Sequence, residues 1–130
     1  MNRLQSFKAY LMYRKAVKAA NDKHREDGHR YFVMPNIDRK IFLIVTDRKN
    51  FRRLRMKGYI DPDMKMEDVF KNCFYYTPQS DGKGRNLTEG ELKIKQVRYQ
   101  LWYDGRLKQI AAARKRRRAA KREARRKGKK

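Results

Sequence analysis

The chain has 130 residues, of which 37 are Lys or Arg and 14 are Asp or Glu, so its formal net charge is +23 at pH 7. Repulsion on this scale indicates a polyanionic partner. The single cysteine, Cys73, excludes a disulfide scaffold and fits the cytoplasm, where we expect the protein to act. The longest strongly apolar run, residues 41–45, is too short to cross a bilayer, and basic residues interrupt the first twenty positions. We therefore expect neither a membrane protein nor a secretory signal.

The apolar residues and the charges divide the chain into two parts. Leu, Ile, Val and Phe account for 25 residues, and none of them follows Ile110. Residues 114–130 hold 12 basic residues and one acid, Glu123, whereas residues 1–113 hold 25 basic and 13 acidic residues. This division predicts a small, basic, ordered domain over residues 1–113 and a basic C-terminal tail over residues 114–130 that is helical or disordered.

The first predicted element is a long amphipathic helix from Arg3 to Arg25, which Gly28 should end. Its apolar residues follow near-helical spacing, and we expect them to form the buried face. They are Leu4, Phe7, Leu11, Val17 and Ala20, with Tyr10 and Ala16 widening the stripe.

A short β-hairpin is predicted next. Residues 31–34 and 41–45 are rich in β-branched and aromatic residues, which favour strands. Residues 35–38, Pro-Asn-Ile-Asp, are typical of a turn between them.

A short basic helix should follow from Arg48 to Lys57. Asp47 is a good N-cap, and Gly58 is a natural stop. Phe51 and Leu54 would face inward.

The rest of the domain is predicted to be helical apart from one loop. A helix over residues 67–74 should bury Val69, Phe70 and Cys73, and residues 75–76 are a candidate extended segment, which the sequence leaves open. Residues 78–86 are typical of a loop, and the Thr88-x-x-Glu91 pattern predicts a capping box that starts a long helix. The apolar residues that this helix carries are Leu92, Ile94, Val97, Leu101 and Trp102. Together these elements predict an α+β fold.

The tail carries the strongest functional signal. A dense run of cations can reach successive phosphates without contacting bases, and Arg, which outnumbers Lys here by 7 to 5, suits bidentate phosphate binding. The candidate nucleic-acid-binding residues in it are Arg114, Lys115, Arg116, Arg117, Arg118, Lys121, Arg122, Arg125, Arg126 and Lys127.

The predicted basic helix over residues 48–57 is the second candidate surface, because it contains no acid. Its candidate residues are Arg48, Lys49, Arg52, Arg53, Arg55 and Lys57. Arg48, Arg52 and Arg55 have i, i+4, i+7 spacing and share one face. Base readout, where it occurs, is expected from nearby Asn50 or from tyrosines.

Other chemistry is weakly indicated. The spacing of His24 and His29 fits the end of a helix better than a metal site, and Cys73 has the surroundings of an inert core thiol. No residue group has a spacing suited to catalysis, so we expect neither an enzyme nor a cofactor nor a metal. The five tyrosines at 31, 75, 76, 99 and 103 fit core positions better than base stacking.

Two blocks carry a resemblance to known sequences. They are Asp47-Arg-Lys-Asn-Phe-Arg-Arg-Leu-Arg-Met-Lys-Gly-Tyr-Ile60 and Glu67-Asp-Val-Phe-Lys-Asn-Cys-Phe-Tyr-Tyr-Thr-Pro78. Together they resemble small uncharacterised basic proteins encoded in gut-bacterial genomes, phages and mobile elements. The tail is similar in composition to the basic extensions of ribosomal proteins. Neither resemblance implies a site residue.

The sequence supports three hypotheses of function. The first is a non-enzymatic nucleic-acid-binding protein, with RNA slightly preferred, acting within a larger ribonucleoprotein such as a ribosome. The second is a duplex-DNA-binding regulator or packaging protein of a phage or mobile element, acting within a phage particle. The third is a cationic adaptor or inhibitor that binds an acidic protein.

Overall fold

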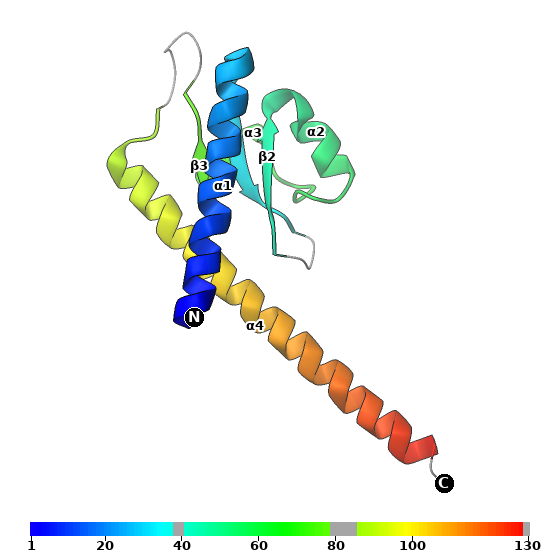
Figure 1. The fold of residues 1–130 in the computed structure, drawn as a ribbon. Coiled ribbons are helices and arrows are strands. Elements are labelled where there is room, and N and C mark those ends of the chain that lie inside the picture. Colours follow the sequence, from blue (N-terminus) through cyan, green and yellow to red (C-terminus); the bar gives the residue numbers. More distant parts are fainter. Residues whose placement is uncertain (38–40, 79–85, 129–130) are drawn as a thin grey trace.

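The computed structural model describes residues 1–37, 41–78 and 86–128, and it confirms the predicted α+β class (Figure 1). In chain order the elements are α1 (Arg3–Asp27), β1 (Tyr31–Pro35), β2 (Leu43–Asp47), α2 (Arg48–Met56), α3 (Met66–Asn72), β3 (Tyr75–Tyr76) and α4 (Glu89–Gly128). Residues 38–40, 79–85 and 129–130 lie outside the described parts, and with them the end of the predicted turn and most of the predicted loop.

The three strands form an antiparallel sheet of order β2-β1-β3. Tyr31 lies opposite Asp47 in the β1–β2 pair, and Phe32 lies opposite Tyr76 in the β1–β3 pair. The predicted hairpin is confirmed, although β2 begins two residues later than expected. Since β1 has a neighbour on both edges, its backbone is hydrogen-bonded on both sides and its residues 31–34 are all buried.

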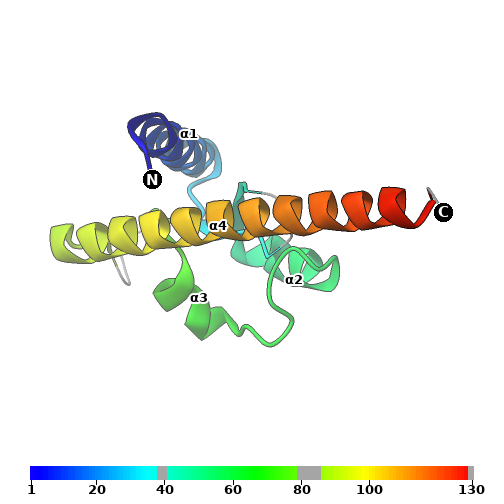
Figure 2. The ribbon, with the colours of Figure 1, turned by 90° about the horizontal axis from the view of Figure 1, so that it is seen from below.

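The alternation of side chains along β1 builds two cores. Tyr31 and Val33 face α1 and α4, whereas Phe32 and Met34 face α2 and α3. In Figure 2, α1 lies on one side of α4 and the two short helices lie on the other. A two-stranded hairpin alone would be marginal, and helices on both faces supply the burial that it lacks.

Helix α1 begins at Arg3 as predicted and ends at Asp27, two residues later than predicted, with Gly28 as the stop, but it buries only part of the predicted face. Asn2 accepts a hydrogen bond from the Gln5 backbone amide at 2.8 Å, and Gly28 ends the helix with a φ of 74°. The buried residues are Ala9, Tyr13, Ala16 and Ala20.

The predicted apolar stripe of α1 was therefore wrong in part: Ala16 and Ala20 are buried as predicted, but its large residues near the N-terminus are not. Leu4, Phe7 and Tyr10 are 62%, 58% and 54% exposed and lie on the outer side of the helix. The alanines explain this outcome, since small side chains let α1 approach the sheet and α4 closely. Tyr13 then fills the gap and donates a hydrogen bond to the Phe74 carbonyl at 2.9 Å.

Helix α4 also buries an unexpected face. It starts after Thr88, whose Oγ1 accepts from the Glu91 amide at 3.2 Å, and it runs unbroken through residues 104–105 to Gly128. Its buried side chains are Lys95, Tyr99 and Tyr103.

The aliphatic residues that the sequence places on α4 do not form its buried face, since Ile94, Val97 and Leu101 are 61%, 59% and 68% exposed. Tyrosines occupy the buried positions instead because their long rings span the gap to α1, where the Tyr99 hydroxyl finds a backbone acceptor. Tyr99 donates to the Ala9 carbonyl at 2.6 Å.

The two short helices lie close to their predicted positions. Asp47 caps α2 by accepting from the Asn50 amide at 2.9 Å, and Gly58 follows it with a φ of 83°. Helix α3 ends at Asn72, two residues earlier than predicted, because the Phe74 amide pairs with the Val33 carbonyl at 2.8 Å and starts the approach to β3.

Residues on α4 stabilise the end of α3. The buried Lys95 ammonium donates to the Phe70 and Cys73 carbonyls at 2.5 and 2.9 Å, and Arg98 donates to the Lys71 carbonyl at 2.5 Å. A cation at a helix C-terminus satisfies free carbonyls and opposes the negative end of the helix dipole.

Two aromatic truncations on α1 test which face is buried. Tyr13→Ala should lower the free energy of unfolding by about 3–5 kcal/mol, because it removes a buried ring and its hydrogen bond. Phe7→Ala should change it by no more than about 0.5 kcal/mol, because Phe7 lies on the outer side. Urea denaturation of both variants measures the difference, and a larger loss for Phe7→Ala would show that the assigned core face is incorrect.

Candidate nucleic-acid interface

The C-terminal half of α4 extends away from the rest of the molecule (Figure 1). Arg106 still contacts the body, since its guanidinium donates to the Asn36 carbonyl at 2.9 Å. From Ala111 to Gly128 the helix continues for 18 residues, a length of about 27 Å at 1.5 Å per residue. We call this segment the basic arm.

The basic arm is strongly cationic. Between Arg114 and Lys127 there are ten Lys or Arg residues, all exposed, and one acid. Among the described residues, the ion pair assigned to this segment joins Lys127 to Glu123 at 3.8 Å. Like charges four residues apart destabilise an isolated helix, so an anion that neutralises them would stabilise the arm.

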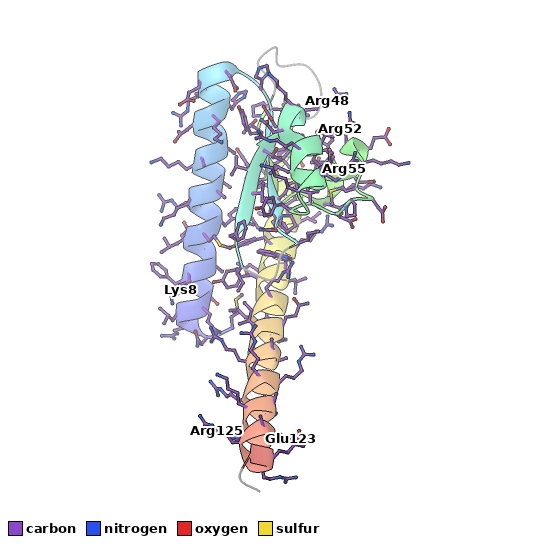
Figure 3. The ribbon with its side chains drawn as sticks, turned by 90° about the vertical axis from the view of Figure 1, so that its right-hand side faces the viewer. Lys8, Arg48, Arg52, Arg55, Glu123 and Arg125 are labelled. Atoms are coloured by element: carbon purple, nitrogen blue, oxygen red, sulfur yellow. The ribbon has the colours of Figure 1, made fainter. Side chains whose placement is uncertain are left out.

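The cations favour one side of the arm. Arg114, Arg118, Lys121 and Arg125 follow i, i+4, i+7, i+11 spacing and so lie along one side. Figure 3 shows Arg125 and Glu123 pointing to opposite sides of the helix. Phosphates would therefore meet the highest density of positive charge on the Arg125 side.

Helix α2 presents the second group of cations. All but one of the six predicted residues are exposed, namely Arg48, Lys49, Arg52, Arg53 and Lys57. Asp47 holds the start of this helix by accepting from both the backbone and the side-chain nitrogen of Asn50, at 2.9 and 2.7 Å. The Asn50 amide group is thus already engaged in capping.

Arg55 differs from the other five predicted residues because it is half-buried. Its guanidinium donates to the Met64 carbonyl at 3.1 Å and lies 5.9 Å from the centre of the Phe51 ring. These contacts tie α2 to the segment that leads into α3, so we assign Arg55 a structural role.

The structure does not bring the two predicted groups together. In Figure 3, α2 with Arg48 and Arg52 lies at the opposite end of the molecule from Arg125 and on the other side of α4. Arg125 instead points to the side on which α1 and its Lys8 lie. A nucleic acid that contacts both groups must therefore span the molecule.

Helix α1 adds a third cationic surface that was not predicted from the sequence. Residues 1–20 contain no acid, and their five basic side chains are all exposed. They are Arg3, Lys8, Arg14, Lys15 and Lys18. The absence of acids in this segment is a sequence signal for a cationic surface. The apolar residues between the cations are also typical of a helix that packs on a core, and that was the interpretation the sequence favoured.

The tyrosines have structural roles, as the sequence favoured. Tyr31, Tyr76, Tyr99 and Tyr103 are buried, which removes their rings from contact with bases. Burial raises the pKa of Tyr99, and a hydrogen bond donated to Asp27 raises the pKa of Tyr31 to about 12. These hydroxyls therefore keep their protons and act as donors near neutral pH.

The histidines and the cysteine do not form a metal site or a reactive site within the described residues. Within residues 1–37, 41–78 and 86–128, no three His, Cys, Asp or Glu side chains gather closely enough to hold a metal ion. The His24 Nδ1 donates to the His29 carbonyl at 2.8 Å, which closes the end of α1. Cys73 is buried, and burial raises the pKa of its thiol despite the neighbouring Lys95 ammonium.

The helices of the described parts are also too polar or too short to cross a membrane. No protein-family model, curated protein or solved structure matches this chain. The roles of its residues therefore rest on their own geometry and chemistry.

Two arginines of α2 provide a matched test, since both substitutions remove one charge. Arg55→Ala should lower the free energy of unfolding by about 1–3 kcal/mol, because the Met64 carbonyl loses a charged donor. Arg52→Ala should change it by less than about 0.5 kcal/mol. Denaturant titration followed by circular dichroism measures both, and equal effects would contradict the structural role of Arg55.

Proposed function

We propose that this protein is a non-enzymatic nucleic-acid-binding protein that prefers RNA and contacts the phosphate backbone through its basic arm. The observation that supports this most directly is the arm itself. Ten exposed cations lie on a helix that leaves the folded body, and a single ion pair joins one of them to an acid within the described residues.

Counterion release would supply the affinity. Each cation that neutralises a phosphate frees a condensed ion, so binding weakens steeply as salt rises. A helix of about 27 Å that is exposed along its length can follow a groove or lie across a backbone. Because such contacts carry no base information, specificity must come from elsewhere in the chain or from a larger particle.

Helix α2 would orient the complex. Its capped start holds Arg48 and Lys49 beside each other, and Arg52 follows one turn later on the same side as Arg48. This surface is separate from the arm, so contacts at both places would hold the nucleic acid in one direction.

A second candidate function is an adaptor that also binds an acidic protein. The exposed apolar residues favour it, because Leu4, Phe7 and Leu11 form a strip on α1 flanked by cations such as Lys8 and Lys15. An amphipathic helix with acidic borders would complement this strip in both apolar surface and charge.

Truncation after Ala113 tests the main proposal. The shortened chain should bind a structured RNA at least about 100-fold more weakly near 100 mM salt. The slope of log K against log salt concentration should become shallower by about 0.7–0.9 for each phosphate that the arm no longer neutralises. Fluorescence anisotropy at several salt concentrations measures both quantities. Equal binding by the two chains would contradict the proposal, provided that thermal melting shows that the shortened chain is folded.

A charge-matched variant of the full chain serves as the control. Ala119→Pro with Ala120→Pro breaks the arm as a helix and leaves every cation in place. If counterion release dominates, this variant should keep most of the salt dependence of the native chain. If this variant lost as much RNA affinity as the truncated chain, binding would depend on the helical structure of the arm and not on its charge alone.

The adaptor function is tested by replacing Leu4, Phe7 and Leu11 together with Ser. The tagged native chain should retain a protein neighbour after nuclease treatment of a lysate, and the variant should lose it while its affinity for RNA stays within about twofold. Retention that is equal in the two chains, or abolished by nuclease in both, would contradict an adaptor role for this strip.

A further inference from the structure

A cavity of about 500 Å³ lies between the start of β1, the first turn of α2 and helix α3. Its volume falls within the range of sites that bind small molecules. The residues around it come from three segments that are distant in sequence, which the fold brings together. Two of the lining residues, Arg48 and Lys49, belong to the candidate nucleic-acid surface of α2.

One wall of the cavity is apolar and aromatic. Phe32, Phe70 and Met66 form it, and the Phe32 and Phe70 rings meet edge to face at 5.2 Å. Phe32 is buried, whereas Phe70 and Met66 are half-buried and can be reached from outside. Such a wall favours a flat aromatic ligand.

A stacked arginine adjoins this wall. The Arg30 guanidinium lies 5.2 Å from the centre of the Phe70 ring and 5.3 Å from that of Tyr76. A planar guanidinium held against aromatic rings is a surface on which nucleobases also stack. Asp27 fixes the backbone on both sides of Arg30, because its carboxylate accepts from the His29 amide at 2.9 Å and from the Tyr31 hydroxyl.

The opposite side of the cavity is cationic. Arg48 and Lys49 are exposed side chains on the first turn of α2, and His29 adds ring nitrogens. The acid in the lining, Asp47, already accepts two hydrogen bonds from Asn50. Positive charge therefore exceeds negative charge where the cavity opens, and this favours a phosphate.

From this arrangement we propose that the cavity binds a single unstacked nucleotide, with its base against the wall that Phe70 and the Arg30 guanidinium form together and its phosphate at Arg48 and Lys49. This inference rests on the proposed function and adds to it a preference for looped or single-stranded segments. A base that is paired within a duplex cannot enter, because it must first leave its stack. The basic arm, by contrast, would bind paired and unpaired segments alike.

The test compares two RNA probes on the full chain. One is a hairpin with a single-stranded loop, and the other is a blunt duplex with the same stem. The native chain should bind the hairpin about tenfold more tightly, in line with the contribution of one stacked base. AMP added alone should shift the backbone amide NMR signals of residues 29, 30, 48 and 49, and ribose 5-phosphate or adenosine should do so more weakly.

Two double variants of α2 provide the matched control. Arg48→Ala with Lys49→Ala should remove the preference for the hairpin and the response to AMP. Arg52→Ala with Arg53→Ala removes the same charge from the same helix, outside the cavity lining, and should weaken both probes equally while the preference remains.

The outcomes separate this inference from the proposed function. If hairpin and duplex bind equally and AMP shifts no cavity signal, the nucleotide site is refuted while salt-dependent binding through the arm still stands. If neither probe binds at all, the proposed function fails. An AMP response that survives Arg48→Ala with Lys49→Ala would also overturn the assignment of the phosphate position.

Discussion

The contact between Tyr99 and α1 determines the arrangement of the whole molecule. The Tyr99 hydroxyl donates to the Ala9 carbonyl at 2.6 Å, and its ring lies 4.9 Å from that of Tyr13, which in turn donates to the Phe74 carbonyl. These contacts join α4, α1 and the segment before β3. Because α4 is one continuous helix, the same contacts also set the direction in which the basic arm leaves the body. Packing within the core and presentation of charge are thus linked through a single helix.

The local signals of the sequence were more reliable than its apolar pattern. Caps and stops placed the helix ends correctly, since Asp47, Thr88 and the two positive-φ glycines act through short-range hydrogen bonds and backbone geometry. The apolar pattern did not identify which large side chains of α1 and α4 are buried, because hydrophobicity alone ranks Leu and Phe above Tyr. Burial here depends on close approach and on hydroxyl partners, which are tertiary properties. The third strand was indicated only as a candidate extended segment at residues 75–76, since two residues carry no periodicity.

The candidate interface was predicted in part. Runs of cations without acids are visible in the sequence, and the structure finds those of the arm and most of those of α2 exposed. The role of Arg55 depends on a carbonyl nine residues away, and the separation of α2 from the arm depends on the whole topology. The cavity beside Arg30 was not foreseen, because its walls come from β1, α2 and α3 and meet only in the folded chain.

The central claim is that nucleic acid contacts the basic arm and the exposed start of α2. Hydrogen–deuterium exchange of the full chain, with and without a structured RNA, tests it most directly because the exposed arm should exchange rapidly when free. We expect RNA to slow exchange over residues 111–128 and 48–53 and to leave the buried strand β1 unchanged. Protection confined to other segments, or none in the arm at low salt, would contradict the claim.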